Sequence, residues 1–133
     1  MAAPAKPKPN PDAPRHVIAA AIKPMLPTRW KIIPYQRDPG VQLDTFVMFK
    51  QSDITRHPQM PQGAHLIVFT VTIVSPYQDE TVAEDDLDAT VPVLLHALDE
   101  ARIAWTECTK TMFGDRLSYD ITLSVSSTPK LGT

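Results

Sequence analysis

The sequence predicts an α+β domain, with two helices packed on one face of a mainly antiparallel sheet of four to five strands. Two observations predict this fold class. Apolar residues recur at helical spacing in one segment near the N-terminus and in another after the middle of the chain. Other segments are rich in β-branched and aromatic residues and are bounded by turn residues. In chain order these elements predict the arrangement α-β-β-β-α-β-β.

Composition narrows the class of protein. The chain has 133 residues and 43% hydrophobic content, which suits one compact domain. Its formal net charge of -2 lacks the basic surplus that is typical of nucleic-acid-binding domains. Its one cysteine, Cys108, excludes an internal disulfide. No signal peptide and no apolar run of transmembrane length is recognised, so we expect a soluble protein made inside the cell, without a membrane partner.

The N-terminal segment differs from the rest of the chain. Residues 1–14 contain five prolines, interleaved with alanine and lysine. Proline fixes φ and lacks a donor, so this segment is predicted to be an extended, flexible arm. Residues 15–133 are predicted to form the single α+β domain.

The first helix is predicted in RHVIAAAIKPMLP, residues 15–27, because its apolar residues fall along one stripe. Asp12 is the expected N-cap, since Pro14 is tolerated in a first helical turn. Pro24 and Pro27 are expected to end the helix. The predicted stripe consists of Val17, Ile18, Ala21, Ile22 and Met25.

Three strands are predicted next, at residues 28–35, 44–54 and 64–75. Pro34 indicates that the first lies at a sheet edge or ends there. The breakers DPG, residues 38–40, predict a turn before the second strand. The third, AHLIVFTVTIVS, is so apolar that we expect it in the centre of the sheet.

The second helix is predicted from Val82 to Ala101, with a kink at Pro92. The segments WTECTKTMF and RLSYDITLSVS then predict a hairpin around Gly114 and Asp115. The last strand alternates between apolar and polar residues, so one face should carry the helices and the other should meet water or a partner. The predicted inward residues are Leu117, Tyr119, Ile121, Leu123 and Val125.

An acidic run, SPYQDETVAEDDLD, joins the third strand to the second helix. It has neither the spacing nor the glycine of a calcium-binding loop. Carboxylates at a helix start are favoured by the exposed N–H groups and by the helix dipole. Two or three acids would satisfy that role, so the surplus, including Asp79 and Glu80 in the preceding turn, indicates an electronegative surface. The six acids are Asp79, Glu80, Glu84, Asp85, Asp86 and Asp88.

No residue pattern predicts catalysis, a metal site or a cofactor. His96 and Glu100 have a helical i, i+4 spacing, but a solvated pair is favoured over a zinc site. Cys108 lies in a threonine-rich strand without a motif for a nucleophile. Phe69 and Tyr119 lie on apolar strand faces, which argues against stacking on RNA bases. We therefore expect a protein that is not an enzyme.

Three segments together resemble the tail terminator (tail completion) proteins of long non-contractile-tailed bacteriophages. They are KPMLPTRWKIIPY, VTIVSPYQDETVAEDDLDATVPVLLHAL and WTECTKTMFGDRLSYDITLSV, within residues 15–127. The resemblance implies a structural virion protein made in the host cytoplasm. It implies a homohexameric ring at the head-proximal end of the tail, which stops tube polymerisation. The implied partners are the tail tube protein and the head-completion or connector protein, with DNA passing through the lumen.

Two sets of residues are candidates for this role. Acids that face a DNA channel would repel phosphates and let the genome slide. The candidate lumen acids are Asp79, Glu80, Glu84, Asp85 and Asp86; the alternative is that they start a helix on the outer rim. The candidate contact loop for the tube or neck contains Arg56, His57, Gln59, Met60 and Gln62. Two other functions stay open: another head-tail connector or neck adaptor, and a small α+β enzyme or ligand-binding domain.

Overall fold

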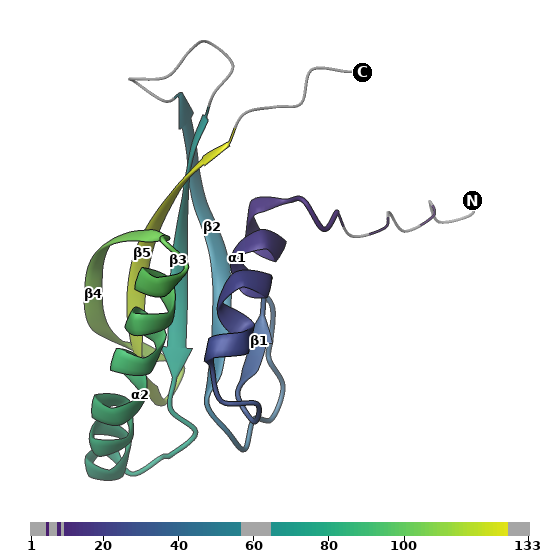
Figure 1. Ribbon diagram of the computed structural model, residues 1–133. Helices are drawn as coiled ribbons and strands as arrows, with labels where there is room; N and C mark the ends of the chain where they lie inside the picture. The colour runs from purple at the N-terminus through teal and green to yellow at the C-terminus, as the bar shows by residue number, and fades with distance from the viewer. Residues whose placement is uncertain (1–4, 6–7, 9, 57–64, 128–133) are drawn as a thin grey trace.

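The computed structural model describes residues 5, 8, 10–56 and 65–127 (Figure 1). The elements follow the predicted order α-β-β-β-α-β-β. They are α1 (Pro14–Ile22), the short 3₁₀ helix η1 (Lys23–Met25), β1 (Lys31–Ile33), β2 (Phe46–Arg56), β3 (His65–Val74), α2 (Glu80–Glu100), β4 (Ala104–Phe113) and β5 (Arg116–Ser127). The predicted fold class is confirmed.

The strands form one mixed sheet in the order β1-β2-β3-β5-β4. β1 pairs with β2 in parallel, and all other neighbours are antiparallel. The apolar strand β3 lies in the centre, as its sequence predicts. β1 is an edge strand that stops before Pro34, which has no N–H to donate to a ladder.

Both helices cover the same face of the sheet (Figure 1). The side chains of β2, β3 and β5 that point toward them alternate with those of the other face. Ile18 and Ile22 of α1 and Leu94 and Leu98 of α2 bury against that layer. The buried sheet residues of this core are Val47, Phe49, Ile67, Phe69, Val71, Ile73, Leu117, Ile121 and Leu123.

The first helix departs from its prediction in two ways. The N-cap is Ala13, without a side-chain cap, so the assignment to Asp12 was wrong. Pro14 is the reason, because a proline disfavours helical backbone in the preceding residue, and Ala13 is extended with ψ 142°. Only Ile18 and Ile22 of the predicted stripe are buried, whereas its other members, Val17, Ala21 and Met25, are exposed.

The second helix begins at Glu80, two residues before the expected start, because Asp79 caps it. It continues through Pro92 to Glu100. At its C-terminus, Arg102 adopts the left-handed conformation with φ 58°. The N–H of Ile103 donates to the Leu98 carbonyl at 2.9 Å and that of Arg102 to the Asp99 carbonyl at 3.0 Å. This pair of bonds is a Schellman motif, and it turns the chain sharply into β4.

Among the described elements, no helix lies over the opposite face of the sheet. At one end, Phe46, Met48 and Val74 form a second, smaller apolar cluster with Ile33 and Phe113. Beyond this cluster the face carries hydroxyl and charged groups, and the Thr72 hydroxyl donates to the Asp120 carboxylate at 2.7 Å. Along the other end of β2, residues 50–56 are all exposed. No helix within the described residues is both long and apolar enough to cross a membrane.

Candidate functional site

Three of the five candidate lumen acids form a hydrogen bond or an ion pair within the fold. Asp79 is the N-cap of α2, and its carboxylate accepts from the Val82 N–H at 3.1 Å. Asp86 accepts from the hydroxyl of Ser75 at 2.9 Å, and Ser75 is fully buried. Glu84 forms an ion pair with Lys110 of β4. Asp79 was counted among the surplus acids, and this was wrong because it starts the helix.

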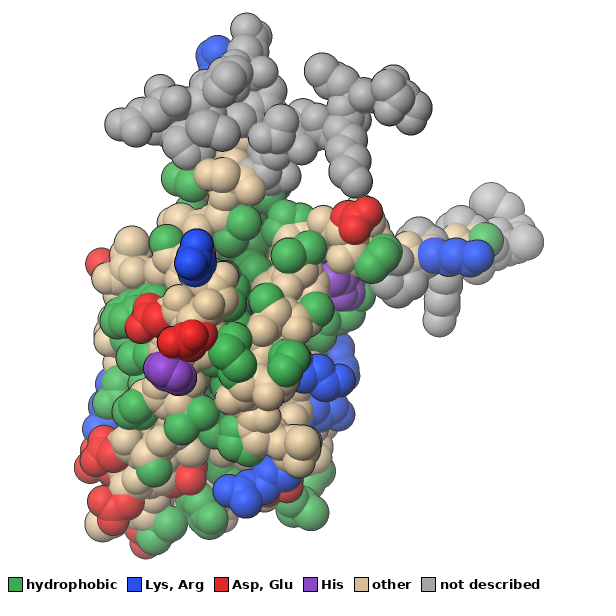
Figure 2. Space-filling view, in the orientation of Figure 1, with side chains coloured by type: hydrophobic (Ala, Val, Ile, Leu, Met, Phe, Trp, Pro, Cys, Tyr) green, Lys and Arg blue, Asp and Glu red, His purple; other side chains and the backbone are tan. Residues whose placement is uncertain are grey.

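The other two acids, Glu80 and Asp85, are exposed and make no hydrogen bond or ion pair with any described residue. Acidic side chains gather around the first turns of α2, toward the lower left in Figure 2. Glu80 and Asp85 are therefore free to act on solvent or a partner. Their position does not by itself define a binding site.

The Glu84–Lys110 pair connects the acidic run to β4, the edge strand. Its hydrogen bond to Glu84 raises the pKa of Lys110, and the charges of Glu84, Tyr119 and Asp88 act in the same direction. Both side chains are about half exposed, so solvent screens the pair and its contribution to stability is small. The pair fixes where one acid points more than it stabilises the fold.

The candidate contact loop is described only at its first residue. Arg56 is the last residue of β2 and is exposed. His57, Gln59, Met60 and Gln62 lie outside the described residues. β2 and β3 run side by side up to this loop, and they extend past both helices in Figure 1.

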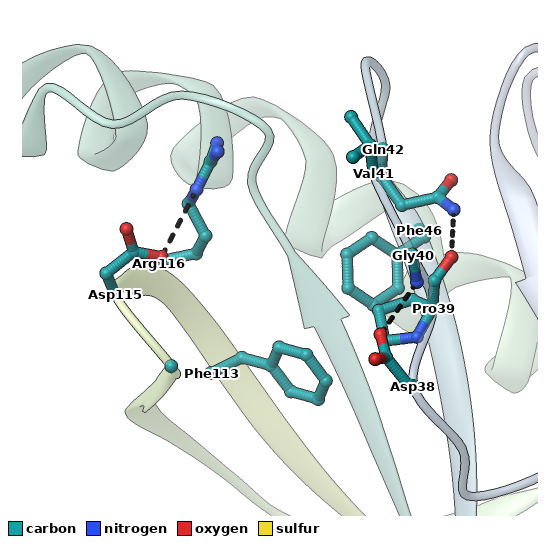
Figure 3. A pocket seen from close by; sticks show the side chains of 10 residues that line it. Asp38, Pro39, Gly40, Val41, Gln42, Phe46, Phe113, Asp115 and Arg116 are labelled. Carbon is teal, nitrogen blue, oxygen red and sulfur yellow. Dashed lines mark hydrogen bonds and ion pairs between the residues drawn. The ribbon is translucent and has the colours of Figure 1, made fainter.

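Sequence reasoning predicted the turn between β1 and β2 but missed the apolar side chains that it exposes. Val41 and Leu43 there are 91% and 86% exposed, the highest values among the large apolar side chains of the described residues. The Asp38 carboxylate accepts from the Gly40 N–H at 2.9 Å, and the Gln42 amide donates to the Pro39 carbonyl (Figure 3). Gly40 has φ 71°, which a residue with a side chain adopts only under strain. The loop thus holds its apolar side chains outward in a defined conformation.

The sequence did contain a signal for this loop. In DPGVQLD, residues 38–44, two aliphatic residues lie between two acids and directly after a Pro-Gly turn. Turn chemistry predicts exposure, and an aliphatic residue at an exposed turn has no folding role. The prediction of a turn was confirmed, but its apolar content was not considered.

A cleft of about 330 Å³ separates this loop from the β4–β5 turn (Figure 3). Its apolar wall contains Phe46 and Phe113, whose rings meet edge to face with centroids 5.4 Å apart. Asp115 and Arg116 form an ion pair at 3.5 Å on the other side. The Arg116 guanidinium also donates to the Pro76 carbonyl. These groups pack the two turns against each other, and the described residues that line the cleft include no serine, cysteine or histidine.

The remaining candidates for chemistry occupy ordinary structural positions. His96 and Glu100 lie 4.0 Å apart on the exposed side of α2, which confirms the predicted solvated pair. Cys108 packs against the main core, and this burial raises the pKa of its thiol. Phe69 and Tyr119 also belong to or pack against that core, as expected. Within the described residues, no group of three or more His, Cys, Asp or Glu residues could hold a metal ion.

Comparison with models of known protein families gives no match, and comparison with curated proteins gives no significant match. The basis for a function is therefore the fold, its exposed surfaces and the sequence pattern.

Proposed function

We propose that this chain is a structural virion protein of the tail-terminator type. In this role it forms a ring at the head-proximal end of a phage tail tube, stops tube polymerisation and joins the tail to the head-completion complex. The proposal is supported by the resemblance of three segments to such proteins and by their arrangement as η1–β1, β3–α2 and the β4–β5 hairpin of one domain.

The proposal rests on three exposed features of the fold that are available for contact with other subunits: a sheet face, an edge strand and a loop. The sheet has an uncovered face, and β4 is an edge strand of ten residues whose outer side pairs with no described strand. An exposed edge of this length is a template for association unless a protein manages it. An exposed aliphatic loop lies at the same end as the β4–β5 turn. All three features are surfaces of the kind that subunits of an assembly bury against one another.

The test is to determine the assembly state together with the capping activity. Native mass spectrometry and negative-stain images of the purified protein should show a ring with a central hole. Added to polymerising tail tubes, the protein should give tubes of limited length with one capped end. Tubes that grow without limit and carry no cap would contradict the proposed function. A monomer that binds finished tubes would instead indicate a neck adaptor.

We further propose that the acids Glu80 and Asp85 face the lumen of this ring. They are the informative pair to change, because Asp79, Glu84 and Asp86 have contacts in the fold. In a phage that carries Glu80→Gln and Asp85→Asn, DNA ejection should be slower, since fewer charges repel the passing phosphates. The matched control is Glu100→Gln with Glu107→Gln, which removes two exposed acids elsewhere. Equal ejection rates in both variants would exclude the lumen position.

A further inference from the structure

One side of α1 is not covered by any other described part of the chain. Val17 is 51% exposed and Ala21 is exposed, although Ile18 between them is buried. These residues form one wall of a hollow of about 270 Å³. The opposite wall is the turn from α2 into β4, and the end of β5 closes the hollow. We call this feature the helix-end hollow.

The hollow is apolar inside, with Ile103 and Val125 among its lining residues. Arg102 is the one charged residue that lines it within the described part of the chain. Arg102 is exposed and forms no ion pair with a described residue. Its left-handed backbone is fixed by the Schellman motif, so the point from which its side chain extends beside the hollow is also fixed.

The exposed loop of residues 38–44 has the complementary properties, and we call it the loop knob. Its tip presents Val41 and Leu43, and Asp38 and Asp44 flank them. The segment contains two acids and no base. An aliphatic tip with an acidic rim is complementary, in polarity and in charge, to an apolar hollow with a basic residue at its rim. The internal hydrogen bonds of the knob lower the entropy that is lost when it is ordered by a partner.

A molecule cannot fill its own hollow with its own knob. The knob lies against the cleft that includes Arg116, the first residue of β5. The hollow includes Ser126, next to the last residue of that strand. Arg116 and Ser126 are ten residue steps apart along this extended strand, so they lie on the order of 30–35 Å apart. When one copy inserts its knob into another, one knob and one hollow stay unused, and a third copy can bind.

We propose that the loop knob of one copy inserts into the helix-end hollow of the next copy. This contact is heterologous, so repeating it gives a closed ring or an open filament and not a two-fold dimer. The proposal rests on the proposed ring function and names the surface that would build the ring. Its occupant is a second copy of this chain, and the pairing of Asp38 and Asp44 with Arg102 sets the orientation.

The first test removes each half of the contact in the full-length chain. Val41→Ser with Leu43→Ser removes the knob, and Val17→Glu with Ala21→Glu blocks the hollow. Each double variant should raise the dissociation constant of the assembly about 100-fold or more, because two aliphatic side chains lose their burial. All four positions are exposed, so circular dichroism and thermal unfolding should show folded protein. The matched control, Val93→Ser, changes an exposed aliphatic residue of α2 outside both features and should assemble normally.

The second test mixes the two double variants in equal amounts. The knob variant still has its hollow, and the hollow variant still has its knob. Native mass spectrometry should therefore detect a one-to-one dimer and nothing larger, because this pair can form a single contact. A mixture that stays monomeric, or that forms rings, overturns the proposal.

The third test exchanges the charges. Asp44→Arg and Arg102→Asp should each weaken assembly, and the variant that carries both should recover most of it. Aspartate is a suitable replacement at position 102 because it tolerates left-handed backbone better than most residues. If the double variant is as weak as the sum of its two changes, the two side chains do not meet.

The outcomes separate this contact from the proposed function. Rings that persist in the knob variant overturn the contact and leave the ring function standing. A wild-type protein that is monomeric at about 1 mM also overturns the contact, since even weak specific association would be populated at that concentration. The tube-capping experiment decides the ring function independently of either result.

Discussion

The two faces of the sheet are made by the same strands and are covered in different ways. Under the helices, Phe69, Ile121 and Leu123 are almost fully buried. On the other face, their neighbours Thr70, Thr122 and Ser124 are only half-buried. Strict alternation along β5 produces this difference, because adjacent side chains point to opposite faces.

The first residues of β2 show what happens where alternation fails. Phe46, Val47, Met48 and Phe49 are all buried, so this short stretch is apolar on both faces. One face lies under the helices, and the other is closed by Val74, Ile33 and Phe113. The apolar part of the second face is thus covered by side chains of neighbouring strands, whereas its polar part is not covered by any described helix.

The largest expected effect is on the helix-covered face. Phe69→Ala should lower the free energy of unfolding by about 3–5 kcal/mol, because it leaves a cavity in a fully packed layer. Thr70→Ala, one residue along and on the open face, should change it by less than about 0.5 kcal/mol. Urea denaturation of both variants measures the difference. Similar losses in the two would mean that the open face is as tightly packed as the covered one.

A smaller effect is expected from the hydrogen bond on the open face. Asp120→Ala removes the acceptor of the Thr72 hydroxyl and should cost about 1 kcal/mol. A double-mutant cycle with Thr72→Val isolates the pair, and its coupling energy should account for most of the loss. If the coupling energy is zero, this bond does not contribute to the stability of the open face.

The two faces should also differ in the chemistry of a thiol. Cys108 pairs with Ile121 on the covered face, and burial raises the pKa of its thiol above 9.0. At pH 8 it should react several-fold more slowly with a disulfide reagent than Thr109→Cys, on the open face, in a Cys108→Ser background. Stability should fall as the pH rises above 9.0, because the unfolded thiol loses its proton first. Equal rates at the two positions would contradict the shielding of Cys108.

The smallest effect is expected at Ser118, which is fully buried although it lies on the open face. Its hydroxyl is fully buried and has no hydrogen-bond partner among the described residues. Ser118→Ala removes this unpaired group and should leave stability unchanged or raise it by up to about 1 kcal/mol. Thermal unfolding is sufficient to detect the direction. A clear loss would show that the hydroxyl has a partner, such as a bound water.

Local pattern was enough to predict the elements, their order and the two faces of the last strand. Leu117, Ile121 and Leu123 are buried as the alternation indicates, and the uninterrupted apolar character of β3 predicts its central place. The order of the strands was not predictable in the same way. Nothing in the sequence of β4 says that it lies outside β5, because that choice depends on long-range pairing.

The exposed surfaces were harder to predict than the core. A helix with an apolar stripe as wide as that of α1 can bury only the part that meets the sheet, and this left Val17 and Ala21 outside. Part of the acidic run, including Asp79, was predicted to be surplus to the helix start, yet the cap at Asp79 and the contact between Ser75 and Asp86 depend on where β3 meets α2. Val41 and Leu43 were overlooked because turn residues predict the backbone conformation of a loop and do not predict whether its exposed side chains contact a partner.

The central pairing of the sheet also has a consequence for synthesis on the ribosome. Thr72 of β3 and Asp120 of β5 are hydrogen-bonded neighbours, but 48 positions separate them in the chain. The most apolar strand therefore leaves the exit tunnel long before the strand that completes its pairing, while its free edge can bind other nascent chains. Non-local pairing of this kind also closes slowly. The core can form only after β5 has left the tunnel, so chains that stop after α2 should depend on a chaperone or aggregate.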